Sequence, residues 1–168
     1  MTGDTTREEL ATRFGAELEA VWGAPERCDS HEAALTRAAA IIGDRPARVD
    51  DHPDLAGLHE RVTTVDNPED AEVGVTGVLV AASETGTLVL APGPGQPRAT
   101  SLVPPEHLAL VPLDRLVATY ADAIDRIAAL DALPSSVHLI TGPSRSADIE
   151  LTPIRGVHGP ERVRVLLY

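Results

Sequence analysis

Two nearly continuous apolar segments constrain the fold of this chain more than any other feature of its sequence. They are VGVTGVLVAA at residues 73–82 and TLVL at residues 87–90. Strands that are apolar on both faces lie inside a protein, with other layers packed on either side, which is typical of a parallel sheet covered by helices. The sequence therefore predicts that this part of the chain runs through the interior of a sheet.

Helical and strand-like patterns alternate through the rest of the sequence. Apolar residues recur at helical spacing over residues 6–22 and 30–42, and Thr6 and Asp29 are the expected N-terminal caps of these helices. The other predicted elements are helices at 53–61 and 114–129, a loop at 142–150 that opens a helix, and strands at 48–49, 62–65, 107–111, 137–141 and 163–167. The 114–129 helix, capped by Asp114, would bury Leu116, Val117, Tyr120, Ile124 and Ile127. This alternation predicts an α/β fold in which helices flank a mostly parallel sheet.

The charge distribution separates an acidic first part of the chain from the remainder. Residues 1–72 hold 17 acidic residues against 7 arginines, whereas residues 73–168 hold 9 against 7. We expect 1–72 to be a mainly helical N-terminal part of the same domain and 73–168 to be the α/β core. The chain has no basic stripe and few aromatic residues, which disfavours nucleic acid binding. An anionic membrane surface would repel a chain with a net charge of −12.

Two residue counts restrict the chemistry of the chain. All 14 basic residues are arginine, which excludes a lysine Schiff base. Cys28 is the only cysteine, so this chain alone cannot hold an iron–sulfur cluster or a cysteine-rich zinc site. No pair of candidate ligands has a recognised metal-binding spacing, and we expect no metal site. The sequence shows neither a signal peptide nor a membrane-spanning apolar run, which predicts a cytoplasmic protein.

The first candidate site is the SETG segment, residues 83–86. Glu84 directly follows a strand that we expect to be buried, and ligands of α/β sheets bind beyond the carboxyl ends of strands. A partly desolvated carboxylate there could act as an acid, a base or a nucleophile. Gly86 would leave the approach open, and Thr85 and Thr87 would contact the ligand. The alternative is that SETG is a hairpin turn in which Glu84 is solvated.

The second candidate site is the segment 142–150, which contains Gly142, Ser144, Arg145 and Ser146. The free N–H groups of a helix that begins here would combine with the serine hydroxyls and the guanidinium to bind a small carboxylate or a phosphate. In the alternative interpretation, one of the serines only caps the helix and Arg145 pairs with Asp148.

Two further residues are candidates for the same site. Arg98 lies in a proline-rich loop and could contact the same anion, or it could be solvated. His158 lies in a tight loop before the last strand. It could serve as a general acid or base, or it could hold the loop through hydrogen bonds to the backbone.

Four linked motifs resemble the LUD-domain family, which includes lactate utilization protein C. They are SETGTLVL at 83–90, R-x-x-SLVPPEHLALV at 98–111, TGPSRSADIEL at 141–151 and RGVHGP at 155–160. The resemblance covers residues 73–168 and implies a fold like that of CoA transferases and ribose-5-phosphate isomerase. SETG is also similar to the Ser-Glu-Asn-Gly signature around the CoA-transferase nucleophile, with Thr85 in place of the asparagine.

The resemblance implies a subunit that takes part in the oxidation of L-lactate to pyruvate. The subunit would bind a small anionic ligand and no cofactor of its own, and iron–sulfur partner proteins would carry the clusters. Two alternatives stay open. One is a free-standing enzyme that uses Glu84 on an acyl-CoA or a sugar phosphate, and the other is a regulatory module that binds a ligand without catalysis.

Overall fold

The main sheet of the protein has five strands, and every neighbouring pair in it is parallel. The computed structural model describes residues 6–147, 153–155 and 159–168. The strand order is β1-β11-β6-β3-β2. The strands are β1 (Ala24–Arg27), β2 (Ala47–Val49), β3 (Val73–Thr76), β6 (Glu106–Val111) and β11 (Arg162–Leu167). The predicted α/β fold with a mostly parallel sheet is confirmed, and two strands of this sheet come from the first 72 residues.

A second, mixed sheet of four strands has the order β7-β4-β5-β8. Its strands are β4 (Val80–Ala82), β5 (Thr87–Leu90), β7 (Leu116–Val117) and β8 (His138–Ile140). The apolar segment 73–82 is therefore divided between two sheets, with β3 in the main sheet and β4 in the second. Every residue of β3, β4 and β5 is buried, as their composition predicts.

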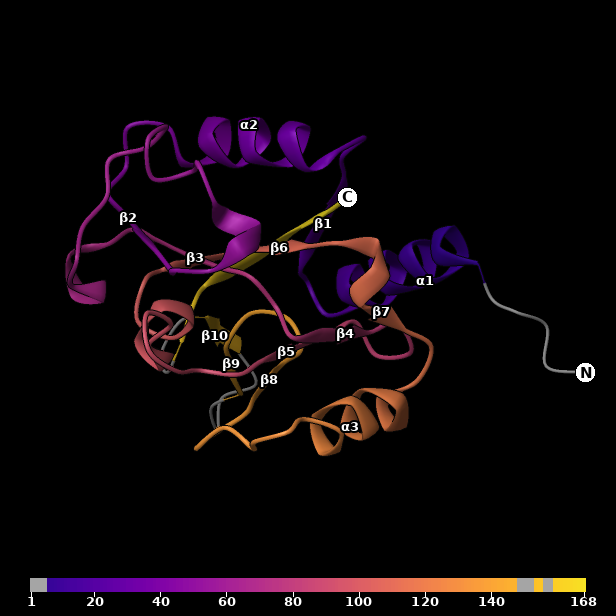
Figure 1. The fold of residues 1–168 in the computed structure, drawn as a ribbon. Helices are drawn as coiled ribbons and strands as arrows, with labels where there is room; N and C mark the ends of the chain where they lie inside the picture. Colours follow the sequence, from indigo (N-terminus) through magenta and orange to yellow (C-terminus); the bar gives the residue numbers. More distant parts are fainter. Residues whose placement is uncertain (1–5, 148–152, 156–158) are drawn as a thin grey trace, which may run out of the picture.

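Within the described residues, three α-helices complete the layers: α1 (Arg7–Ala20), α2 (His31–Ile42) and α3 (Tyr120–Ala128). Figure 1 shows α2 on one side of the main sheet, and the second sheet followed by α3 on the other side. One apolar core joins α2 to the main sheet through Leu35, Ala38, Ile42, Val75, Leu108 and Leu166. The other joins α1 and the second sheet to the opposite face through Phe14, Leu18, Leu88, Ala109 and Val165. None of the helices in the described ranges is long and apolar enough to cross a lipid bilayer.

The caps of the first two helices follow from short-range hydrogen bonding. The backbone N–H of Glu9 donates to Thr6 Oγ1 over 3.2 Å and that of Thr6 donates to Glu9 Oε2 over 2.8 Å, so the expected cap Thr6 forms a capping box with Glu9. In α2 the cap is Ser30 rather than Asp29, because Ser30 Oγ accepts a hydrogen bond from the backbone N–H of Ala33. α2 ends at Gly43, where the backbone has a φ of 60°.

The predicted helix at 114–129 is wrong in its first part. Leu116 and Val117 are buried as expected, but they form β7, which pairs with β4. The α-helix begins only at Tyr120, after the cap Thr119, whose Oγ1 accepts from the backbone N–H of Asp122. Pairing with a buried strand therefore outweighs the helical pattern of this segment. Consequently Tyr120 and Ile124 are exposed instead of buried.

Three other expected elements are also wrong. The helix expected at 53–61 is only a short 3-10 helix, η1 (Pro53–Leu55). Residues 145–147 do not open a helix, because they form β9 (Arg145–Ala147), which pairs with the antiparallel strand β10 (Pro153–Arg155). The partner strand satisfies backbone groups that a helix would have paired internally. The strand expected at 62–65 is reduced to a single bridge between Thr64 and Ala47. The remainder of the second candidate segment, from 148 to 150, lies outside the described residues.

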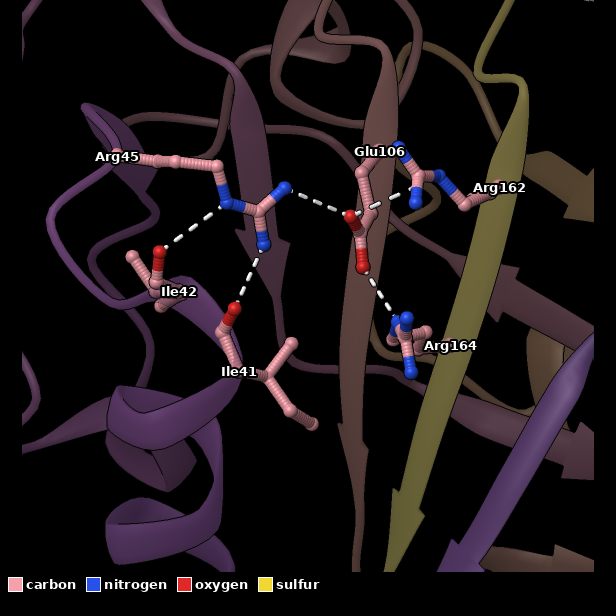
Figure 2. A network of polar contacts seen from close by, with 6 residues as sticks. All are labelled: Ile41, Ile42, Arg45, Glu106, Arg162 and Arg164. Carbon is pink, nitrogen blue, oxygen red and sulfur yellow. Dashed lines mark hydrogen bonds and ion pairs between the residues drawn. The ribbon is translucent and has the colours of Figure 1, made fainter.

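One buried carboxylate joins three arginines at the amino end of the main sheet (Figure 2). Glu106, the first residue of β6, has a side chain only 1% exposed. Its oxygens lie 2.8 Å from Arg45 Nη1, 2.5 Å from Arg164 Nε and 3.9 Å from Arg162 Nε. Burial alone would raise the pKa of Glu106, but hydrogen bonds from Arg45 and Arg164 outweigh it and lower that pKa.

The same network holds the end of α2. Arg45 also donates to the carbonyl oxygens of Ile41 and Ile42, over 2.7 and 3.1 Å, so it caps the carboxyl end of the helix (Figure 2). The network therefore ties α2 to β6 and β11 and has a structural role.

Candidate functional site

Three adjacent parallel strands of the main sheet end at one cavity. β2 is followed by Asp50, β3 ends at Thr76, and Arg115 comes shortly after β6. All three residues line a cavity of about 120 Å³, which we call the Asp50 cavity. Its other polar lining residues are His52, Gln96 and Ser101. Ligands of open α/β sheets bind beyond the carboxyl ends of the strands, so this cavity is the candidate functional site.

Asp50 is the buried acid of this cavity. Its backbone N–H donates to the carbonyl of Val75 over 3.0 Å, which extends the pairing of β2 with β3 and fixes the residue in place. The residue is 4% exposed, and Oδ1 accepts a hydrogen bond from Thr100 Oγ1 over 2.7 Å. Burial raises the pKa of Asp50 to about 6, against the opposing effects of Thr100 and Arg48. A carboxyl group that is buried in a cavity and has a raised pKa is a candidate for a functional residue.

Arg115 is the cation of the same cavity. Its Nη1 donates to the carbonyl of Val78, and its Nη2 lies 3.1 Å from Asp54 Oδ2. The ring of His52 lies beside it, with Nε2 at 3.4 Å from Arg115 Nη1. A guanidinium carries five N–H groups in a planar fork, so donors remain for the carboxylate of a ligand. Burial lowers the pKa of His52, the nearby Arg115 lowers it further, and Asp54 opposes both.

Gly77 makes room for this arrangement. A Cβ atom at this position would lie 2.2 Å from His52 Nδ1, so any larger residue would displace the imidazole ring. The strand predicted to continue through GVTGVLVA is interrupted here, because β3 ends at Thr76 and β4 begins at Val80. The glycine therefore lies at the break between the two sheets and leaves room for the His52 ring.

A second buried histidine fixes the position of Thr76. Nε2 of His107 and Oγ1 of Thr76 are 2.8 Å apart, and His107 is fully buried. Burial lowers the pKa of His107 to about 4, so its ring is neutral at pH 7. The pair anchors the hydroxyl group of Thr76 at the wall of the cavity.

SETG forms the turn of the antiparallel hairpin between β4 and β5. Glu84 is exposed, and its Oε2 accepts a hydrogen bond from the backbone N–H of Tyr120 over 3.0 Å at the first turn of α3. The expectation that Glu84 is desolvated at a pocket mouth is therefore wrong. Its assignment as a nucleophile or base stays a prediction without support from this geometry.

The structure does bring SETG close to the end of β8. Thr87 Oγ1 lies 2.7 Å from both Thr85 Oγ1 and Thr141 Oγ1, which makes a chain of three hydroxyl groups. The glycines on either side do not open a path for a ligand, however. A Cβ atom at Gly86 would lie 2.6 Å from Leu18 N, and one at Gly142 would lie 2.6 Å from Val21 O. The carboxyl end of α1 lies against both glycines and occupies the space beside them.

The other expected site residues are dispersed. Gly142 and Ser144 line a separate hollow of about 180 Å³, which also includes Ser101. Arg145 and Ser146 belong to β9, so they do not form the helix N-terminus that was to bind the anion. Arg98 is exposed at the start of the short 3-10 helix η3 (Arg98–Ser101). His158 lies outside the described residues.

Sequence reasoning missed Asp50, His52 and Arg115. Asp50 and His52 follow the predicted strand at 48–49, so the carboxyl-end rule already applied to them. Arg115 was placed inside an expected helix, although it follows the predicted strand at 107–111. Among the described residues, no group of three or more His, Cys, Asp or Glu side chains could hold a metal ion.

Similar proteins support the family that the four motifs indicated. Lactate utilization protein C of Exiguobacterium is 41% identical over 101 residues, which are 58% of this chain and 44% of that protein. Lactate utilization protein C of Bacillus subtilis is 39% identical over 103 residues, which are 59% of this chain and 43% of that protein. The matched region thus spans less than half the length of these relatives.

A solved structure and a family model cover more of the chain. The crystal structure of a DUF162 family protein from Deinococcus radiodurans superposes with a TM-score of 0.71 and 24% identity, over 96% of this chain and 98% of that one. It shows a shared fold. The family model described as LUD domain matches residues 28–168, including α2 and β2, which precede the motifs. The chain therefore belongs to the LUD domain family.

Proposed function

We propose that this protein contributes to lactate utilization by binding a small carboxylate in the Asp50 cavity. The observation that carries the proposal is the position of Arg115 in a cavity where three parallel strands end. A dry cavity of about 150 Å³ accommodates benzene, so about 120 Å³ suits a molecule of about six non-hydrogen atoms, such as lactate or pyruvate. The names of the similar proteins supply the metabolic context.

Arg115 is the cation that an anion of this size would use in the cavity, and it shares its charge with Asp54, whose Oδ2 lies 3.1 Å from Arg115 Nη2. The chain as a whole carries a net charge of −12, so a ligand anion needs a local cation to bind. Arg115 supplies that charge with a side chain only 29% exposed, where the interaction is less screened than at the surface. The neutral form of His52, favoured by burial, adds a hydrogen-bonding ring beside the guanidinium.

We expect Arg115→Gln to weaken the binding of L-lactate or pyruvate by at least about tenfold, because a charge-assisted hydrogen bond to a carboxylate is lost. Isothermal titration of the whole chain measures this loss. The matched control is Arg126→Gln, which removes the same charge from an arginine that does not line the Asp50 cavity. The thermal midpoint of each variant reports whether it is folded. Failure of the wild-type protein to bind any small carboxylate, or unchanged affinity in a folded Arg115→Gln variant, contradicts the proposal.

The second part of the proposal concerns partners. The protein acts in the cytoplasm as a subunit that binds no cofactor of its own, and iron–sulfur partner proteins carry the redox clusters for the oxidation of L-lactate to pyruvate. The single cysteine, Cys28, supports this division because a cluster needs several thiolates. Affinity purification from native cells grown on lactate should recover iron-containing partners. Normal growth on lactate after deletion of the gene, with no such partner recovered, contradicts this part.

A further inference from the structure

The Asp50 cavity contains a fixed acceptor as well as a cation. Asp50 follows β2 and its carboxylate is held by Thr100 from η3, whereas Arg115 reaches the cavity from the segment after β6. The two groups therefore come from separate elements, and each is anchored by bonds that exist without a ligand. A ligand that satisfies both groups must carry a carboxylate for Arg115 and a second polar group for Asp50.

We infer that Asp50 makes this cavity selective for a 2-hydroxy carboxylate over the corresponding 2-oxo carboxylate. The inference rests on the proposed function, since it requires that a small carboxylate occupies the cavity. It extends that function by naming the residue that distinguishes the reduced form of the ligand from the oxidised form.

The selectivity follows from the hydrogen-bonding properties of three groups: the carboxylate of Asp50, the hydroxyl group of a 2-hydroxy acid and the carbonyl group of a 2-oxo acid. An ionised carboxylate only accepts hydrogen bonds, and the hydroxyl group of a 2-hydroxy acid can donate one to it. The carbonyl oxygen of a 2-oxo acid has no proton to donate, so it would face the negative charge of Asp50 with no bond to offset the repulsion. Sites that bind a hydroxyl group in this way reject analogues that lack it much more strongly than apolar pockets do.

The groups that face Asp50 keep the carboxylate available at neutral and higher pH. Arg48 on β2 lowers the pKa of Asp50, and so does the hydrogen bond from Thr100 on η3. Burial raises it to about 6, so most of the side chains are ionised at pH 8 and most are protonated at pH 5. The remaining charged or titratable groups at the cavity are His52, beside Asp54, and Arg115.

Protonation changes what Asp50 can recognise. A protonated carboxyl can donate to a carbonyl oxygen as well as accept from a hydroxyl group. The preference for the 2-hydroxy acid should therefore be largest at pH 8 and should decline at pH 5. An asparagine at position 50 has both a donor and an acceptor at every pH, so it should lose the preference without losing the shape of the cavity.

The test is isothermal titration of the whole chain with L-lactate and with pyruvate at pH 8 and pH 5. We expect wild-type protein at pH 8 to bind L-lactate at least about tenfold more tightly than pyruvate, and Asp50→Asn to bind the two within about threefold. The matched control is Asp51→Asn, which removes an exposed carboxylate from the neighbouring position and should keep the wild-type ratio. The pH series on wild-type protein tests the same residue without a substitution.

The outcomes separate this inference from the proposed function. Equal affinities for the two acids at pH 8, tighter binding of pyruvate, or an unchanged ratio in Asp50→Asn overturn the inference and leave carboxylate binding in place. Absence of binding for both acids in the wild-type protein overturns both. A preference for L-lactate that disappears in Asp50→Asn and persists in Asp51→Asn supports the inference.

Discussion

Glu106→Gln should lower the free energy of unfolding by about 3 kcal/mol. Removing one partner of a buried ion pair costs several kcal/mol, because the remaining charges lose their compensation, and here three arginines share one carboxylate. The expected value is at the low end of that range because the arginine side chains are 30–60% exposed to water. Thermal unfolding should show a midpoint lower by about 6–12 °C for a chain of this length.

The control for this prediction is Glu32→Gln, which removes a surface carboxylate. Glu32 lies 2.9 Å from Arg61, but its side chain is 70% exposed, so its loss should change stability much less. Equal midpoints for the two variants would show that the Glu106 network does not stabilise the fold.

The same network predicts a loss of stability in acid. The pKa of Glu106 in the folded protein is below its ordinary value of 4.5, so its contribution is fully present above pH 4.5 and is lost as the pH falls through the lowered pKa. Glu106→Gln should therefore show a shallower decline of stability than wild-type protein below pH 4.5.

Elements determined by local interactions could be predicted from the sequence. The capping box of Thr6 and Glu9 and the helical spacing of Leu10, Phe14 and Leu18 involve only near neighbours in the chain, and α1 forms as these residues predict. β6 and β11 were also predicted, because each is an apolar run of strand length that lies in the middle of the sheet.

Elements determined by distant partners could not be predicted in the same way. Residues 116–117 fit a helical stripe, but β4 pairs with them in space. Residues 142–147 begin with a glycine and contain two serines that could cap a helix, Ser144 and Ser146, but β10 pairs with residues 145–147 instead. A propensity of a few tenths of a kcal/mol per residue is smaller than the effect of such tertiary pairing.

The candidate site was missed for a related reason. The rule that ligands bind at the carboxyl ends of strands is satisfied by the Asp50 cavity. It was applied to β4, which the structure places in the second sheet and pairs with β5 in a hairpin, so Glu84 lies in a hairpin turn. β2 has only three residues, so its apolar pattern is too short to mark Asp50 as the residue at the end of a buried strand.

Asp50→Asn should raise the free energy of unfolding at pH 8 by about 3 kcal/mol. The pKa of this carboxyl is 3.8 in its ordinary environment and about 6 in the folded protein, so ionised Asp50 opposes folding at pH 8. Asparagine is neutral, has nearly the same shape, and can still accept the hydrogen bond from Thr100. Urea unfolding at pH 8 measures the difference, and Asp51→Asn, which removes an exposed carboxylate, should change stability little.

The pH dependence tests the cause of that stabilisation. The folded state retains the proton of Asp50 between about pH 4 and pH 6 while the unfolded state releases it, so the favourable effect of this group is complete below pH 3.8 and is lost as the pH rises through 6. The free energy of unfolding of Asp50→Asn should therefore exceed that of wild-type protein by a large amount at pH 8 and by a small amount at pH 3.5. An equal difference at both pH values would show that ionisation of Asp50 is not the cause. A substitution that stabilises the fold and removes the preference for a 2-hydroxy acid would show that the carboxylate is present for recognition, since stability alone favours its replacement.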